Sequence, residues 1–326
     1  MSYIVGLKSP AGIVMSADTL ETIAEEVDYV EKLEIIRSRA CEVVVGGAGR
    51  SELIDGFIQD LTKRVNKRRK VLNEKQLSTL LETALGTFYD RDVASLSGKY
   101  KEISFLIAAR LLPNGGMQLW RTKARRLFEV RDRAAIGYGG TLGRHAAKRL
   151  FQPDLSLGQM VLASVYILVV AKTTSRVVGG PTSVVLIRDN GISREDEGYV
   201  TALEDRLKVF ERHVNEIFLH CADTGLNPTR FEGMLVDFCA QALSLHQSYI
   251  ADVFQGMVRA GLNSGSGDAY PKLPPGFTGI VAAGDMDNVY TPDQKAALIR
   301  RIREEAKRIS WGGAMPSTSQ TSKDRT

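Results

Sequence analysis

The stretch that decides the fold reads Ser2-Tyr-Ile-Val-Gly-Leu-Lys-Ser-Pro-Ala-Gly-Ile-Val-Met-Ser-Ala-Asp18. Two β-rich runs, Tyr3–Lys8 and Gly12–Ala17, flank Ser9-Pro-Ala11, and this pattern predicts a β-hairpin. Ser2 directly follows Met1. If Met1 is removed, Ser2 carries both a hydroxyl nucleophile and a free α-amine, which is a base with a pKa near 8. One residue would then supply the nucleophile and its base.

A second pair of strands is expected downstream of this hairpin. The runs Lys32–Arg37 and Glu42–Val45 are β-rich and flank a short polar connection. The motif Gly46-Gly-Ala-Gly49 then ends a strand and begins a helix. In the predicted helix, apolar residues recur at helical spacing, at Leu53, Ile54, Phe57, Ile58, Leu61 and Val65. A second helix is predicted from about Glu74 to Asp90.

Strands return after residue 102. The runs Ile103–Leu112 and Gly116–Arg121 are joined by Pro113-Asn-Gly-Gly116, which is a strong hairpin signal. Further predicted elements are strands Leu127–Val130 and Ala134–Ile136, a helix Thr141–Phe151, a long apolar helix to about Thr174 with Ser156 as N-cap, and a strand Ser183–Arg188. Because the strands pair as hairpins and not through βαβ crossovers, antiparallel sheets covered by helices are favoured.

The character of the sequence changes near residue 196. Two long amphipathic helices are expected at Val200–Ala222 and Pro228–Ala260. A linker, a short strand at Phe277–Ala283 and a charged helix beginning at Thr291 follow. We therefore expect a domain over residues 1–195, a mainly helical C-terminal extension over 196–310 and a disordered tail over 311–326.

Composition narrows the function classes. The chain has 326 residues, 44% hydrophobic and 25% charged, as in globular proteins, and its net charge is +5. Its densest basic run, Lys63–Lys70, is better explained as a solvated helix end than as a nucleic-acid contact, because no nucleic-acid-binding motif accompanies it. We expect no nucleic-acid partner.

Cysteines, histidines and apolar runs add further expectations. Three cysteines lack paired spacing, which favours a reducing, cytoplasmic location. Four histidines show no metal-ligand pattern. We expect no signal peptide, and the run Met160–Ala171 is too short to cross a membrane. No metal, no organic cofactor and no membrane partner are expected.

Six motifs in order resemble the proteasome-type N-terminal-nucleophile hydrolases, that is, proteasome β-subunits and the bacterial HslV-like peptidase. The matches are the strand behind Ser2, Gly12-Ile-Val-Met-Ser-Ala-Asp18, Glu-Lys32-Leu-Glu-Ile-Ile, Val-Val-Gly46-Gly-Ala-Gly49, Ala-Ile-Gly137-Tyr-Gly-Gly140 and Val-Gly179-Gly-Pro-Thr-Ser-Val-Val. The resemblance implies a four-layer αββα sandwich of two antiparallel sheets with the helical extension appended. Each motif is weak alone, and their order is what is specific.

The resemblance also implies a site. Ser2 stands where the family has its nucleophile, which is normally Thr. Asp18 and Lys32 would form the charged pair beside it, with Lys32 lowering the pKa of the hydroxyl or of the α-amine. The backbone N–H of Gly46 or Gly47 would bind the oxyanion. Peptide-bond hydrolysis in a self-compartmentalised homo-oligomeric ring would follow, with unfolded proteins or peptides as substrates and an AAA+ unfoldase as a candidate partner.

The chain departs from the family pattern at three positions. Tyr138 replaces a supporting Ser, and Ser175 and Val178 stand where the family has an Asp and a Ser. These replacements keep two alternatives open. One is a catalytically inactive structural or regulatory subunit, and the other is a small-molecule amidase of the same superfamily. A nucleic-acid-binding protein ranks last.

Overall fold

A computed structural model describes residues 2–23, 26–68, 72–96, 98, 102–113, 116–138, 140–223, 225–227, 229–242, 245–246, 297 and 300. The chain divides into two compact units, Met1–Lys208 and Val209–Thr326. The first unit holds all the strands described and the candidate site. The second contains the end of helix α5 (Glu197–His220) and a helical segment at 229–242, where the rings of Phe210 and Phe238 pack 5.3 Å apart.

The first sheet contains the hairpin that opens the chain. Its strand order is β10-β1-β2-β11-β12, and every pairing is antiparallel. The strands are β1 (Tyr3–Ser9), β2 (Gly12–Asp18), β10 (Arg133–Gly137), β11 (Thr182–Arg188) and β12 (Gly191–Arg194). The predicted hairpin is confirmed, with Ser9 opposite Gly12 at its turn.

The second sheet is also antiparallel, with strand order β5-β6-β7-β8-β9. Its strands are β5 (Leu33–Arg37), β6 (Cys41–Ala48), β7 (Ser104–Leu111), β8 (Met117–Lys123) and β9 (Arg126–Glu129). A two-stranded ribbon of β3 (Leu20–Ile23) and β4 (Glu26–Tyr29) precedes it. This ribbon was not predicted, because its alternating carboxylates hide the strand pattern.

The side chains of the central strands alternate between two cores, as the period of a β-strand requires. On β6, Val43 and Val45 join a core with helices α1 (Ser51–Asn66) and α2 (Glu74–Phe88). Val44 points the other way, into a core shared with Ile13 and Met15 of the first sheet. The second sheet therefore packs against helices on one face and against the first sheet on the other. A π-helical turn (Tyr89–Val93) ends α2.

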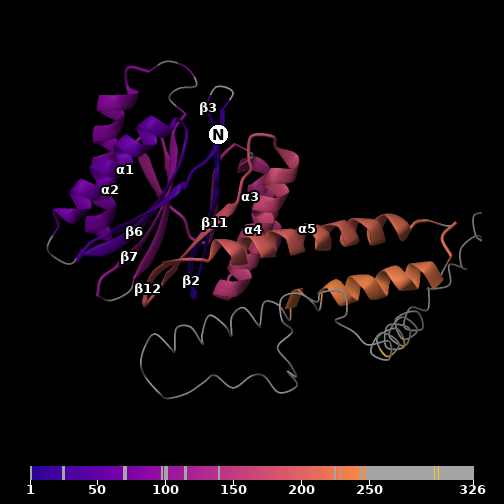
Figure 1. The fold of residues 1–326 in the computed structure, drawn as a ribbon. Coiled ribbons are helices and arrows are strands. Elements are labelled where there is room, and N and C mark those ends of the chain that lie inside the picture. The colour runs from indigo at the N-terminus through magenta and orange to yellow at the C-terminus, as the bar shows by residue number, and fades with distance from the viewer. Residues whose placement is uncertain are drawn as a thin grey trace, which may run out of the picture. The chain divides into compact units, whose positions relative to one another are not determined.

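Two helices lie on the other side of the first sheet, α3 (Gly140–Leu150) and α4 (Leu157–Thr174), and Figure 1 shows them beside β2 and β11. A capping box between Ser156 and Gln159 begins α4, which confirms the predicted N-cap. By length and composition alone α4 could cross a membrane. It contacts β1, β2 and β11, and Ser164 shares a 2.7 Å hydrogen bond with Ser16 of β2. Packing against the sheet accounts for its apolar sequence.

The expectation of an α+β protein with two antiparallel sheets and helices is confirmed. The first predicted helix of the extension is present as α5, and the second is helical over 229–242. The predicted strand Phe277–Ala283, the tail from 311 and, apart from residues 297 and 300, the helix from Thr291 lie outside the described residues.

Candidate active site

A buried ion pair lies at the start of the first sheet. Asp18, the last residue of β2, is fully buried, and its Oδ2 lies 3.0 Å from Nζ of Lys32, whose side chain is 7% exposed. Lys32 Nζ also donates to the backbone oxygen of Leu20 at 2.6 Å. The two residues are fourteen positions apart in sequence, and the fold brings them into contact as the resemblance implied.

The same carboxylate fixes the backbone behind Ser2. Asp18 Oδ1 accepts a 2.7 Å hydrogen bond from the N–H of Tyr3, and Oδ2 accepts one of 3.3 Å from the N–H of Gly179. Hydrogen bonds from N–H groups satisfy the oxygens of a buried carboxylate. Asp18 therefore contacts Lys32, the segment that precedes β11 and the residue that follows Ser2.

Ser2 itself is held through its carbonyl. The N–H of Tyr138 donates to the Ser2 oxygen at 3.0 Å, and Ser2 is 9% exposed. Gly137 sits against the same oxygen with φ +91°, and a Cβ there would lie 1.9 Å from it. Only glycine fits this conformation and this space. Met1 lies outside the described residues.

Burial lowers the pKa of Lys32 from 10.5, although Asp18 and Glu21 raise it and Lys172 adds to the lowering. In the window between this lowered pKa and 10.5 the unfolded chain binds more protons than the folded chain. Stability therefore rises with pH across that window.

We expect Lys32→Met to make the free energy of unfolding rise less steeply up to pH 10.5, measured by denaturant titration at several pH values. The control is Lys75→Met at an exposed position of α2. Equal pH dependence of the unfolding free energy in the wild type and Lys32→Met would contradict a lowered pKa of Lys32.

The strand register shows that the two glycines predicted to bind the oxyanion, Gly46 and Gly47, point their N–H groups in opposite directions. The N–H of Phe105 donates to Thr122 Oγ1 of β8 at 2.8 Å, so it points away from β6. Gly47 is the register partner of Phe105, and opposite residues in an antiparallel pair share this orientation. The N–H of Gly47 therefore points to the β5 side, where the register pairs end at Leu33–Gly46, next to Lys32.

Gly46 has the opposite orientation, with its N–H facing Leu106 in the β6–β7 ladder. A Cβ on Gly46 would lie 2.9 Å from side-chain atoms of Ile4 and Leu33, and one on Gly47 would lie 2.5 Å from Ile54 of α1. Both positions need glycine for packing. The direction of the N–H favours Gly47 as the donor.

Sequence reasoning missed a second buried ion pair, between Lys172 of α4 and Glu204 of α5. A signal was present. Lys172 is the one charged residue of an otherwise apolar helix, and Glu204 shares a helix face with the buried residues Val200, Leu203 and Leu207. Charged residues in such positions are buried only when they are paired. At the three departures from the family pattern, Tyr138 is 55% exposed, Ser175 caps α4 and Val178 is buried.

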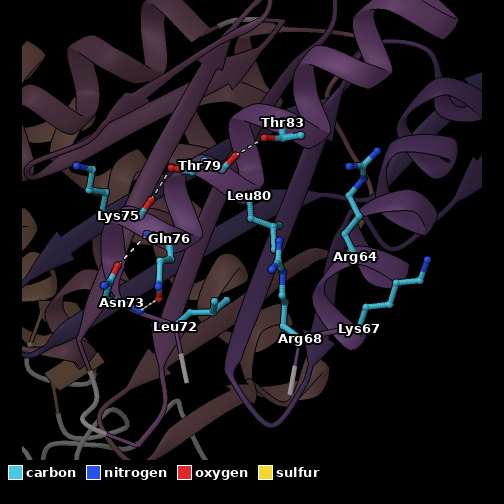
Figure 2. A pocket seen from close by; sticks show the side chains of 10 residues that line it. All are labelled: Arg64, Lys67, Arg68, Leu72, Asn73, Lys75, Gln76, Thr79, Leu80 and Thr83. Carbon is cyan, nitrogen blue, oxygen red and sulfur yellow. Dashed lines mark hydrogen bonds between the residues drawn. The ribbon is translucent and has the colours of Figure 1, made fainter. Parts of the chain in front are cut away.

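A cleft of about 780 Å³ lies away from this site, where α1 ends and α2 begins. Figure 2 shows Arg64, Lys67, Arg68 and Lys75 around it, so part of the basic run noted in the sequence faces this space. Ser2, Asp18 and Lys32 are not among its lining residues. Within the described residues no cluster of His, Cys, Asp and Glu could hold a metal.

Comparison with solved structures shows the fold. An Anbu (ancestral beta-subunit) protein from Yersinia bercovieri is similar with a TM-score of 0.57 and 18% identity, over 69% of this chain and 99% of that one. Anbu from Hyphomicrobium sp. matches with a TM-score of 0.56 and 14% identity, over 69% and 100%. The Anbu complex of Pseudomonas aeruginosa, a helical assembly, matches with 0.55 and 17%, over 66% and 95%. No family model matches the chain, and no curated protein does.

These findings correct the family expected from the sequence. The order of motifs indicated a proteasome β-subunit or an HslV-like peptidase, but no model of any family matches, and the similar structures described above are Anbu proteins. The motifs mark strand ends and helix starts, so they report on the fold and do not identify the family. At identities of 14–18% the likeness establishes the fold alone, an Ntn-hydrolase-like fold of the Anbu kind.

Proposed function

We propose that the protein is an N-terminal-nucleophile hydrolase that cleaves peptide bonds, with Ser2 as nucleophile after removal of Met1. The observation that carries this proposal is the buried Asp18–Lys32 pair, hydrogen-bonded to the N–H of Tyr3 directly behind Ser2. A buried ion pair is costly to desolvate and weak evidence of stability. Its position next to a potential nucleophile favours a functional role.

In the proposed reaction Ser2 Oγ attacks the scissile carbonyl and its own α-amine accepts the hydroxyl proton. The C–N bond of the substrate breaks, the proton passes to the leaving amine, and an acyl-ester remains on Ser2. Water then hydrolyses the ester. Lys32 would favour the deprotonated nucleophile electrostatically, and Asp18 would hold Lys32 in place.

The developing oxyanion would be bound by the backbone N–H of Gly47, which points to the end of β5. Gly46, the other candidate, would let the chain pack closely against Ile4 and Leu33. This division of roles is supported by the strand register and needs no side-chain donor.

The proposed architecture is a four-layer αββα sandwich over residues 1–195, supported by the two cores on either side of the second sheet and by α4 on the first. The extension over 196–310 and the tail over 311–326 complete the proposed organisation. We propose a cytoplasmic homo-oligomer acting on unfolded proteins or peptides without a cofactor, with an AAA+ unfoldase as candidate partner. The helical assembly of the Pseudomonas aeruginosa protein supports the oligomer.

A catalytically inactive subunit of the same fold is the second candidate. Val178 is 3% exposed and apolar where the family resemblance expects a hydroxyl, and Ser175 ends α4 where it expects a carboxylate. An inactive subunit would keep the buried charges for structure alone.

Hydrolysis of unfolded protein and of fluorogenic peptides by Ser2→Ala separates the two candidates. We expect the wild type to be active and Ser2→Ala to lose at least about a hundredfold in kcat, because the nucleophile is gone. Ser78→Ala, which replaces a half-buried serine of α2, is the matched control and keeps full activity. Equal activity in Ser2→Ala and the wild type would refute the proposed nucleophile, and an inactive wild type would favour the second candidate.

A further inference from the structure

Three polar side chains, each from a different element, meet close to the candidate site. Lys172 of α4 donates to Thr182 Oγ1 of β11 at 2.8 Å and is paired with Glu204 of α5. The hydroxyl of Thr182 also donates to Glu204 Oε1. The side chains of Lys172 and Glu204 are 12% and 7% exposed. Lys172 and Glu204 form an ion pair, and the Thr182 hydroxyl is hydrogen-bonded to both of them.

The sheet places this cluster next to the Asp18–Lys32 pair. Thr182 is the register partner of Asp18 in the β2–β11 pairing. On β2, Ile13, Met15 and Ala17 face the core between the sheets. The alternation of side chains therefore directs Asp18 to the opposite face, which is the face that α4 covers. Ser16, the next residue on that face, confirms it by its hydrogen bond to Ser164 of α4.

The two ion pairs act on each other. The charged groups that act electrostatically on Lys32 are Asp18, Glu21 and Lys172, and those that act on Lys172 are Glu204, Asp18 and Lys208. Burial lowers the pKa of both lysines, and Lys172 lowers that of Lys32 further. The two buried lysines thus share one neighbourhood with two buried carboxylates, Asp18 and Glu204, and removal of the Glu204 charge would leave Lys172 without its ion-pair partner.

Glu204 reaches the cluster because it lies on the buried face of α5. Its neighbours on that face, Val200, Leu203 and Leu207, are buried, and α5 begins at Glu197. The carboxylate that balances Lys172 is therefore supplied by the first half of the helix that opens the C-terminal extension.

We propose that Lys172 and Glu204 are positioning residues of the candidate site, and that α5 is required there because its carboxylate keeps Lys172 from competing with Lys32 for Asp18. The inference rests on the proposed function for its catalytic meaning. Without the Glu204 carboxylate, Asp18 is the remaining carboxylate among the groups that act on Lys172. Lys32 then loses part of the attraction that holds its charge, and the pKa of Lys32 falls further.

The experiment compares Glu204→Gln, the double variant Lys172→Met/Glu204→Gln, and Asp205→Asn as the matched control. Asp205 is the adjacent exposed carboxylate on α5, paired with Lys208 at 2.9 Å. The first readout is the titration of the Lys32 ammonium by ¹⁵N NMR, assigned from its loss in Lys32→Arg. The second is the pH profile of kcat for peptide hydrolysis.

We expect Glu204→Gln to lower the Lys32 midpoint at least threefold in proton affinity and to move the alkaline limb of the kcat profile to lower pH by the same factor. The double variant restores both, since it removes the unbalanced lysine with its partner. Asp205→Asn changes neither. If Glu204→Gln fails to fold, the double variant decides: a Lys32 midpoint below the wild-type value overturns the proposal.

The two proposals fail in different ways. A wild type that neither hydrolyses peptides nor reacts at Ser2 refutes the proposed function, while the NMR titration still tests the coupling of the two pairs. A Lys32 midpoint in Glu204→Gln equal to that in Asp205→Asn overturns the positioning role whether or not the wild type is active. Shifted NMR midpoints with an unshifted kcat profile also overturn it, because the cluster would then not influence the reaction.

Discussion

Replacement of Gly137 by Ala is expected to destabilise the protein by more than about 3 kcal/mol and to displace Ser2. The new Cβ would lie 1.9 Å from the Ser2 oxygen, far inside any contact distance, and Gly137 has φ +91°. The strained backbone alone costs about 1–3 kcal/mol, and the clash is with backbone, which cannot rotate away. The hydrogen bond from Tyr138 to the same oxygen would be lost with the shift.

Denaturant unfolding and the rate of covalent capture of Ser2 by an electrophilic inhibitor measure the two effects of Gly137→Ala. The matched control is Gly86→Ala in α2, where a Cβ would meet nothing within 4 Å. We expect that control to be more stable by about 0.5–1 kcal/mol, because alanine favours the helix. Stability within 1 kcal/mol of the wild type together with unchanged capture in Gly137→Ala would show that Ser2 is not held as described.

Asp18→Asn is expected to lower the free energy of unfolding by about 3–5 kcal/mol, the typical cost of breaking a buried ion pair on one side. Asp18 is fully buried and receives hydrogen bonds from the N–H groups of Tyr3 and Gly179 besides its pairing with Lys32. An amide NH₂ would face one of these donors, and the Lys32 cation would be left without its carboxylate.

The double variant Asp18→Asn/Lys32→Met should recover part of the stability lost in Asp18→Asn, because no unpaired charge remains. The surface pair Asp60–Arg64, with side chains 23% and 30% exposed, provides the control. We expect Asp60→Asn to cost less than about 1 kcal/mol. Losses of equal size in Asp18→Asn and Asp60→Asn would mean that the Asp18–Lys32 pair is solvated.

Much of the first sheet could be predicted from local pattern, and the charged pair from the resemblance of ordered motifs. The hairpin of β1 and β2 follows from two apolar runs around Ser9-Pro-Ala11, and Asp18 and Lys32 were singled out because each stands in a motif at the end or the start of a strand. What these signals share is that they depend on residues close in sequence. The fold then brings Asp18 and Lys32 into contact.

The contacts between distant elements could not be predicted in the same way. Glu204 of α5 meets Lys172 of α4 across 32 positions in sequence, and no local periodicity encodes that pairing. The orientation of the Gly47 N–H depends on the register with β7, which a sequence pattern leaves undetermined. The family was misjudged for a related reason, since motifs at strand ends and helix starts report on the fold and not on the family.

The proposed nucleophile is tested most directly by the mass of the N-terminal peptide after treatment of the folded protein with an electrophilic inhibitor. We expect a mature chain that begins at Ser2 and carries the inhibitor on that residue, with no adduct in Ser2→Ala. Retention of Met1 would contradict it, because Ser2 would then have no free α-amine to act as base. An N-terminal peptide that begins at Ser2 but carries no inhibitor would contradict it equally.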